Sequence, residues 1–399
     1  MSTRRALVIG GSLGGLIAAH MLRRAGWDVT VFERNAEELA SRGVGLGTHP
    51  QLIAILKRAG IDFDESMGIK PPLAVCFDRH GQIVFEQPTA RTLSGWSRLY
   101  RALLDALPAR SYRLGKQLTR VEQDASGVTA IFADGARERG ELLVGADGVR
   151  STVRGQFLPE VQPVYAGYVA WRASIEEADV PEKLWRAVVD LYAFCLPEGQ
   201  QVIAYAVPGR DNDTAVGRRA YNIVWYRSVD RATLADNCTD AAGRHHAAGI
   251  PPPLIRPDVV AGIKADAKAA IAPQIAEIFA LTTPFFQPIY DVISPRVVFG
   301  HVALLGDAAC LADNLASAGD DLDAGLKRDE RMQLPVGRTL VEVNREEGAY
   351  LSAQLKPREQ RTAAELHRDI GAVVRAHIDR SDQVGDIVAA HGLSAVAGA

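Results

Sequence analysis

The stretch RALVIGGSLGGLIAAHMLRRAGWDVTVFE, residues 5–33, decides the fold. It opens with an apolar run that contains β-branched residues, which is typical of a strand buried on both faces, and a glycine turn follows at residues 10–15. Apolar residues at helical spacing come next, Gly26 ends them, and a second apolar strand ends on Glu33. This order of strand, glycine turn, helix, strand and acid predicts a dinucleotide-binding βαβ unit.

Each part of this unit has a physical role in holding a dinucleotide. Glycines let the backbone approach a pyrophosphate, the helix N-terminus offers N–H donors and the positive end of a dipole, and the acid binds a ribose hydroxyl. Ser12 stands where the middle glycine of the usual pattern lies, and it is small enough to be tolerated there. The alternative is a glycine-rich turn in some other α/β domain, but the flanking strand, helix and acid favour nucleotide binding.

The composition is that of an ordinary globular protein. A length of 399 residues predicts two domains, or one with insertions, and a net charge of −3 gives no reason to expect nucleic acid or an anionic membrane as a partner. No apolar run reaches the length of about 18 residues that a membrane span needs. The cysteines and histidines show no paired or metal-like spacing, and the first strand leaves no room for a signal peptide. We therefore expect a reduced, cytoplasmic protein without a metal site.

Two later strands also end in an acidic residue. An apolar strand at residues 142–144 leads to Asp147-Gly148, and another at residues 301–305 leads to Gly306-Asp307. Because ligands of α/β sheets bind at the carboxyl ends of parallel strands, each carboxylate is placed to meet a ligand. The alternative for the first is an ordinary helix cap, since Ser151 opens a helix just after it.

Two further segments indicate where the rest of a binding site lies. The first is rich in glycine, and in the second aromatic or β-branched residues alternate with polar ones. The glycines of residues 41–47 predict a backbone that packs against something flat or phosphorylated, with a flexible connector as the alternative. Between residues 165 and 227, aromatic and β-branched residues alternate with polar ones, which predicts an antiparallel sheet with one wet or ligand-facing side. For any single aromatic residue, packing within the sheet is favoured over contact with a substrate. The candidate substrate contacts are Trp171, Arg172, Tyr205 and Trp225.

Taken together, the three motifs and the β-rich insert resemble the FAD-dependent aromatic hydroxylases, single-component flavoprotein monooxygenases with a para-hydroxybenzoate-hydroxylase-like fold. Residues 96–100, 165–172 and 207–210 look like those of the 2,6-dihydroxypyridine 3-monooxygenase branch. The resemblance implies an α/β fold: a Rossmann-like FAD-binding domain with an inserted antiparallel β-sheet substrate domain and C-terminal helices.

The same resemblance implies how the chain divides into domains. The FAD-binding domain would comprise residues 1–72, 98–164 and 286–320, and the substrate domain residues 73–97 and 165–285. Residues 321–399 would form a C-terminal helical segment, which the sequence pattern predicts to be helical to about residue 355, except around Pro335.

By resemblance, the dinucleotide is FAD. Glu33 would bind the adenosine ribose, Asp147 and Gly148 would serve the pyrophosphate region and the approach of NAD(P)H, and Asp307 would bind the ribityl chain. No residue stands out as a catalytic acid or base. The full set of implied FAD contacts is Gly10, Gly11, Ser12, Leu13, Gly15, Glu33, Arg34, Arg42, Leu118, Asp147, Gly148, Gly306 and Asp307.

The implied activity is hydroxylation of a small aromatic substrate: a phenol, a hydroxypyridine or a polyketide-like ring. NAD(P)H would reduce the flavin, and O2 would then be used through a flavin C4a-hydroperoxide. A homodimer is compatible with this interpretation, and neither a nucleic acid nor a membrane is an expected partner.

One segment departs from the family pattern. In these enzymes Gly-Asp-Ala-Ala continues into a loop with a proline and a glycine pair, whereas here residues 310–315 resemble the family sequence that follows that loop. By this comparison roughly 15–20 residues are missing, or the loop has diverged. A gap would remove donors from the flavin ring and admit water. The alternative function is therefore a flavin-poor or flavin-free relative that binds a ligand or catalyses a non-redox step such as cyclisation.

Overall fold

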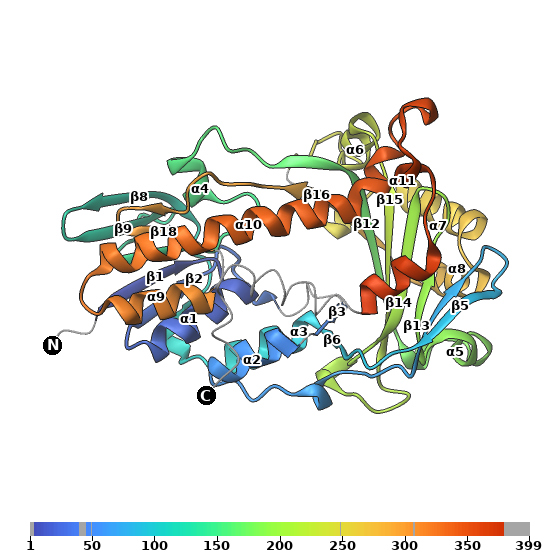
Figure 1. Cartoon of the computed structure of the whole chain (residues 1–399), viewed down its shortest axis with the longest axis horizontal. Helices are drawn as coiled ribbons and strands as arrows, with labels where there is room; N and C mark the ends of the chain where they lie inside the picture. Colours follow the sequence, from blue (N-terminus) through green and yellow to red (C-terminus); the bar gives the residue numbers. More distant parts are fainter. Residues whose placement is uncertain (1–3, 40–44, 49, 248, 306–307, 379–399) are drawn as a thin grey trace.

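The structure is a computed structural model that describes residues 4–39, 45–48, 50–247, 249–305 and 308–378. Two large β-sheets lie side by side, each with its own helices, and one long helix crosses both of them (Figure 1). Among the described residues, no helix combines the length and the apolar character that crossing a membrane requires.

The first sheet, called the parallel sheet here, is built around the predicted βαβ unit. β1 (Arg5–Ile9) pairs in parallel with β2 (Asp28–Phe32) on one side and with β11 (Leu142–Gly145) on the other, and α1 (Leu13–Arg24) connects the first two. The sheet continues to β7 (Tyr112–Arg113) at one edge, and to β18 (Val302–Leu304) and the antiparallel β17 (Val298–Phe299) at the other. β1 is therefore central, as its continuous apolar run predicts.

Both faces of the parallel sheet are covered. On one face lies a small antiparallel sheet of β8 (Leu118–Asp124), β9 (Gly127–Phe132) and β10 (Arg137–Gly140), next to α4 (Thr152–Phe157). On the other face lie α1, α2 (Pro50–Arg58), α3 (Trp96–Asp105) and α9 (Ala308–Ala318). Leu7 packs toward the small sheet and Val8 toward the helices, and both are fully buried. The α/β fold class is confirmed.

The second sheet, called the large sheet here, has the strand order β16-β12-β15-β14-β13-β4-β5. All neighbours are antiparallel except β13 and β4, which run parallel. The strands are β4 (Leu73–Phe77), β5 (Ile83–Pro88), β12 (Val164–Glu176), β13 (Leu191–Cys195), β14 (Gln200–Val207), β15 (Ala220–Ser228) and β16 (Phe285–Asp291).

One domain boundary needs a correction. Residues from 286 onward were assigned to the FAD-binding domain, but β16 pairs with β12 at the edge of the large sheet. The reason is that Phe285 and Phe286 lie opposite Arg172 and Trp171, where Phe286 adds to the apolar core of that sheet. The other boundaries remain a prediction.

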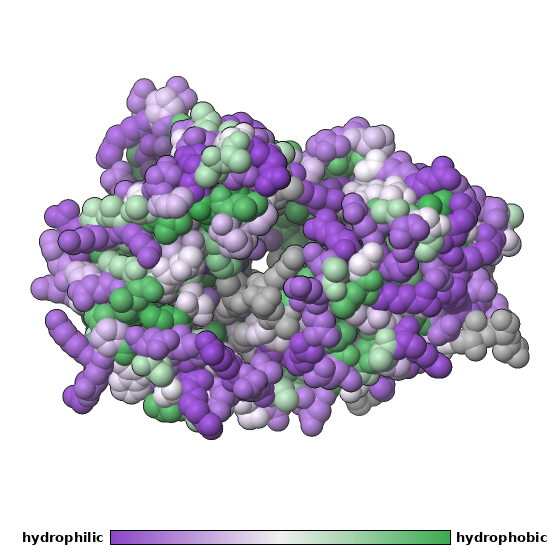
Figure 2. Space-filling view, turned by 180° about the vertical axis from the view of Figure 1, so that it is seen from behind, coloured by the Kyte–Doolittle hydropathy of each residue, from purple (hydrophilic) through white to green (hydrophobic). Residues whose placement is uncertain are grey.

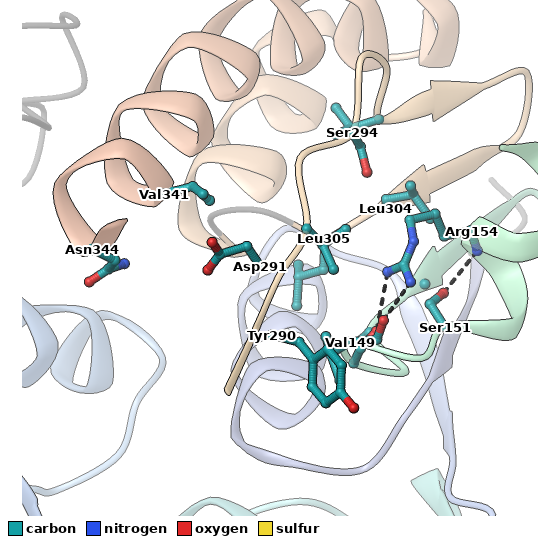
Figure 3. Close-up of a pocket in the computed structure, with 15 residues that line it drawn as sticks. Val149, Ser151, Arg154, Tyr290, Asp291, Ser294, Leu304, Leu305, Val341 and Asn344 are labelled. Carbon is teal, nitrogen blue, oxygen red and sulfur yellow. Dashed lines mark hydrogen bonds between the residues drawn. The ribbon is translucent and has the colours of Figure 1, made fainter. Parts of the chain in front are cut away.

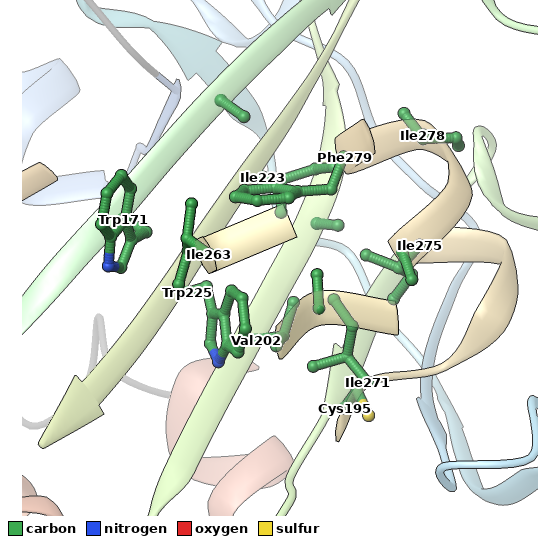
Figure 4. Packing of buried hydrophobic residues seen from close by; sticks show 14 of the residues in the cluster. Trp171, Cys195, Val202, Ile223, Trp225, Ile263, Ile271, Ile275, Ile278 and Phe279 are labelled. Carbon is green, nitrogen blue, oxygen red and sulfur yellow. The ribbon is translucent and has the colours of Figure 1, made fainter. Parts of the chain in front are cut away.

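A layer of helices covers one face of the large sheet. α5 (Glu182–Val188), α7 (Pro257–Ala270) and α8 (Pro273–Leu281) pack there, with α6 (Arg231–Asn237) nearby, around a core that includes Trp171, Trp225 and Phe279 (Figure 4). The opposite face, called the open face here, looks toward the first sheet and its helices. A two-stranded sheet of β3 (Gly45–Gly47) and β6 (Leu93–Gly95) lies against it.

The C-terminal part of the chain links the two sheets. α10 (Leu322–Ala353) packs on α9 and β17 at one end and on β12 and β15 at the other, and α11 (Ala363–Leu366) follows it. The expected interruption at Pro335 does not occur, because α10 is continuous through this residue. A further helical stretch, residues 370–378, ends the described chain and packs on the open face through Val374.

Candidate active site

The glycine turn after β1 is packed too closely to accept side chains. A Cβ on Gly10 would lie 2.3 Å from the carbonyl oxygen of Ala146, and one on Gly15 would lie 1.9 Å from the carbonyl oxygen of Gly10. Gly10 also has a φ of +109°, a conformation that favours glycine. The turn thus brings the N-terminus of α1 against the ends of β1 and β11, which is the geometry a pyrophosphate needs.

The N-terminus of α1 is available to a ligand. Ser12 is its N-cap residue, yet its side chain makes no capping hydrogen bond, so the serine does not occupy the N–H groups of the first turn. Leu13 is the first residue of the helix. The structure therefore brings together the five predicted pyrophosphate residues in one turn, namely Gly10, Gly11, Ser12, Leu13 and Gly15.

Glu33 lies beside this turn at the end of β2. The residue is only 5% exposed, and its carboxylate accepts hydrogen bonds from the backbone N–H groups of Gly11 and Asn35, each at 2.9 Å, and from the side-chain amide of Asn35. Each carboxylate oxygen can accept more than one hydrogen bond, so capacity is left for a ribose hydroxyl. Glu33 is held where the βαβ unit needs its acid.

The remaining predicted FAD contacts differ in how far the structure describes them. Arg34 is exposed next to Glu33. Leu118 is buried at the start of β8, in the core with Phe32 and Phe132, so its contact with FAD remains a prediction. Arg42, Gly306 and Asp307 lie outside the described residues.

Asp147 caps a helix. It accepts hydrogen bonds from the backbone N–H of Thr152 at 2.7 Å and of Val153 at 3.2 Å, and from the hydroxyl of Ser151. The helix-cap alternative therefore describes this side chain correctly. Gly148 beside it has a φ of +81° and open space around the position of a Cβ. A role of this pair in the approach of NAD(P)H stays a prediction.

A cavity of about 530 Å³ opens at the carboxyl ends of β11 and β18 (Figure 3). Arg154 and Tyr290 line it, and Val341 and Asn344 of α10 form its far wall. Ala146 and Leu305 also line it, and they touch the glycine turn at Gly10 and Gly14. The cavity thus adjoins the turn, at the edge where α/β sheets bind ligands, and its volume is that of a small-molecule site.

Two of the four predicted substrate contacts are core residues. Trp171 and Trp225 lie opposite each other in the pairing of β12 with β15, and both point toward α7 and α8 (Figure 4). Trp225 is fully buried there, and its indole N–H donates to Gln200 at 2.9 Å. Because successive side chains of a strand point to opposite faces, neither tryptophan reaches the open face, so their assignment as substrate contacts is wrong.

Arg172 and Tyr205 do lie on the open face, and the structure adds Asn222 between them. Asn222 is paired with Tyr205 in the register of β14 and β15, is fully buried, and accepts a hydrogen bond from the N–H of Gly45 at 3.2 Å. Gly45 lies against the ring of Tyr205, since a Cβ would be 2.6 Å from Cε2. Gly45, in the part of the glycine-rich segment that the structure describes, thus packs on an aromatic ring, and residues 41–44 lie outside the described residues.

The pKa of Tyr205 is raised, chiefly because the side chain is buried and then because Tyr192 lies nearby. The two guanidinium groups of Arg172 and Arg91 act in the opposite direction, which places both near the ring. Arg91 was missed from the sequence, and so was Asn222. The strict alternation of β15 places Asn222 on the same face as Val224, which is a signal that could have found it.

Comparisons with known proteins place this geometry in a family. A model described as an FAD binding domain-like family matches residues 165–291, and a model of NAD(P)-binding Rossmann-like domains matches residues 8–38. The 2,6-dihydroxypyridine 3-monooxygenase of Paenarthrobacter nicotinovorans is 30% identical over 319 residues, which are 80% of this chain and 79% of that protein. The 6-hydroxynicotinate 3-monooxygenase of Pseudomonas fluorescens is 34% identical over 44% of this chain and 49% of that protein.

A solved structure shows the same arrangement over nearly the whole chain. The 2,6-dihydroxypyridine-3-hydroxylase of Arthrobacter nicotinovorans superimposes with a TM-score of 0.80 at 27% identity, covering 88% of this chain and 93% of that one. The similar proteins are FAD-dependent monooxygenases, so the flavin-free alternative is not favoured. The chain belongs to the FAD-dependent aromatic hydroxylases, with FAD as cofactor and NAD(P)H as co-substrate.

Proposed function

We propose that this enzyme hydroxylates a small, electron-rich aromatic ring of the hydroxypyridine kind, bound between the parallel sheet and the open face of the large sheet. The observation that carries the proposal is the similarity to 2,6-dihydroxypyridine 3-monooxygenase, which extends over 80% of the chain. The buried Tyr205 and Asn222, which contact Gly45 on the open face, support this location.

The residues of the glycine turn fit the cofactor, because Gly10 and Gly15 have no side chain that would keep a pyrophosphate away from the N-terminus of α1. Glu33 would accept a ribose hydroxyl. When bound, FAD would supply the redox chemistry by which NAD(P)H and O2 put one oxygen atom into the ring and release the other as water. The share of this chain is to bind, to orient the ring and to exclude water.

The absorbance spectrum of the purified protein between 350 and 500 nm tests the cofactor. We expect a flavin spectrum, directly or after addition of FAD. Glu33→Gln should weaken FAD affinity by roughly 10-fold, the value of one charge-assisted hydrogen bond. Glu38→Gln is the matched control, since Glu38 is an exposed acid that pairs with Arg101. A colourless protein that FAD does not reconstitute would contradict the proposal.

Turnover tests the reaction. Oxidation of NAD(P)H should accelerate when 2,6-dihydroxypyridine or 6-hydroxynicotinate is added, and the product should carry one atom derived from ¹⁸O2. Consumption of NAD(P)H with release of H2O2 alone, for every ring tested, would contradict hydroxylation and point to a site that water enters.

We also propose that the enzyme forms a homodimer. Ile83 and Val84 of the edge strand β5 are 49% and 50% exposed, an apolar edge that a second copy would cover. Sedimentation equilibrium should report twice the mass of the chain, and Val84→Lys should shift the species to the monomer. A wild-type monomer at micromolar concentration would contradict it.

A further inference from the structure

Three nitrogen–hydrogen donors around Tyr205 are buried without a partner. Nε of Arg91, Nε of Arg172 and Nδ2 of Asn222 have no hydrogen-bond partner within the part of the chain that the structure describes. A buried donor without a partner destabilises the folded protein, and more so when the group is charged. Folded proteins satisfy nearly all such groups, so several together indicate a site that a ligand completes.

The strands bring these donors to one place. Arg172 lies opposite Val224 on the open face, and Asn222 lies one pair further along β15, opposite Tyr205 of β14. Arg91 approaches from the other side. A Cβ on Gly47 would lie 2.8 Å from its guanidinium, and Gly45, two residues earlier in β3, touches Tyr205. Both arginines are close enough to Tyr205 to lower its pKa.

The charge of this cluster is uncompensated. Arg219, a buried arginine of the same domain, differs in this respect, because its guanidinium donates hydrogen bonds to the carboxylates of Glu177 and Asp190. Arg172 makes no ion pair with a described carboxylate, and the hydrogen bond of Arg91 goes to the neutral carbonyl oxygen of Ile378 at 3.3 Å. Two guanidinium groups repel each other unless an anion lies with them.

We propose that Arg91, Arg172 and Asn222 form a receptor for a negatively charged oxygen of the aromatic substrate. The inference rests on the proposed function and deepens it, because it makes the substrate an anion. Guanidinium and amide N–H groups are suited to two sources of this charge, an ionised ring oxygen or a ring carboxylate. Tyr205 and Gly45 would then hold the plane of the ring beside the charge.

Isothermal titration calorimetry tests the receptor on the full-length protein saturated with FAD. The first probe is 2,6-dihydroxypyridine, which carries its negative charge on an oxygen attached to the ring. The second is 6-hydroxynicotinate, which has a carboxylate, and the third is uncharged pyridine. Arg172→Met, Arg91→Met and Asn222→Leu should each weaken binding of at least one anionic probe by about 10-fold or more. Pyridine binding should change less than about 2-fold. Arg210→Met is the matched control, since this arginine pairs with Glu176 on the surface.

The two anionic probes separate the sources of charge. Loss for 2,6-dihydroxypyridine, alone or together with 6-hydroxynicotinate, means that the receptor binds the oxygen attached to the ring, and loss for 6-hydroxynicotinate alone means that it binds the carboxylate. Equal affinity of variants and wild type for both anions would overturn the receptor, as would wild-type protein that binds neither. If Arg172→Met fails to fold, Arg172→Lys and Asn222→Asp serve instead: the first should retain part of the affinity, and the second should lose it by charge repulsion.

This outcome is independent of turnover. Calorimetry reads the anion directly, and the same titration on protein without FAD shows whether the receptor needs the cofactor. A protein that binds the anions through these residues but never hydroxylates them would contradict the proposed function and leave the receptor standing. A hydroxylase whose ligand affinity ignores all three substitutions would do the reverse.

Discussion

The two faces of the large sheet differ in character, although the same strands form both of them. On the helix-covered face, Trp171, Ile223 and Trp225 fill a dry core. On the open face, one residue away along each strand, Arg172 and Asn222 present buried donors without partners. Alternation along β12 and β15 thus separates stability from recognition, so that a substitution on one face should leave the property of the other unchanged.

The largest effect that we expect lies on the helix-covered face. Trp225→Ala removes a fully buried indole and should lower the free energy of unfolding by about 3–5 kcal/mol. Urea denaturation measures this, and Trp225→Phe should lose less because more of the volume is kept. If Trp225→Ala left stability unchanged and weakened binding of the aromatic substrate instead, the division between the faces would be wrong.

The paired arginine should make the fold sensitive to acid. Burial raises the pKa of Glu177, but hydrogen bonds from Arg219 and Trp185 outweigh it and lower the pKa from 4.5 to about 2. The stabilisation is complete above about pH 4.5 and is lost as the pH falls toward 2, a total of roughly 3 kcal/mol. Unfolding followed by circular dichroism from pH 6 to 2.5 should show a smaller acid-dependent loss in Glu177→Gln than in the wild type.

On the open face, the close contact of Gly45 with Tyr205 should be intolerant of a methyl group. Gly45→Ala places a Cβ 2.6 Å from the ring, so β3 has to move away. We expect a loss of stability of roughly 1–3 kcal/mol and a rise in KM for the aromatic substrate of about 10-fold. Steady-state kinetics measure the second effect, and an unchanged KM would mean that β3 is not part of the substrate wall.

The smallest effect should appear in a helix above the dry face. Gly262 is an exposed residue of α7 with open space around it, so Gly262→Ala should stabilise the protein by about 0.5–1 kcal/mol through helix propensity. Thermal unfolding reports this gain. Because α7 does not reach the open face, binding of the aromatic substrate should stay the same, and a changed affinity would reveal coupling between the faces.

The sequence predicted best what depends on neighbours in the chain. The unit of β1, α1 and β2 follows from local patterns and turn residues, and the structure confirms it. It predicted poorly what depends on packing between distant segments. The alternation of side chains along a strand predicts that Trp171 and Arg172 lie on opposite faces of the sheet. Only the position of α7 and α8 decides which of these faces becomes the apolar core. For the same reason Arg91, contributed by a distant loop, was not found.

The helix α10 has a mechanical consequence for the site between the two sheets. It holds 32 residues, about 48 Å of length, and is packed on both sheets at once, so the domains cannot rotate apart unless it bends. Proline has no N–H group, so Pro335 donates no hydrogen bond to the carbonyl oxygen of Arg331. Bending of α10 at Pro335 therefore breaks no hydrogen bond at the nitrogen of this residue. Val341 and Asn344, which wall the cavity, follow that point within three turns. Bending of α10 at Pro335 would therefore move Val341 and Asn344 and so change the volume of the cavity.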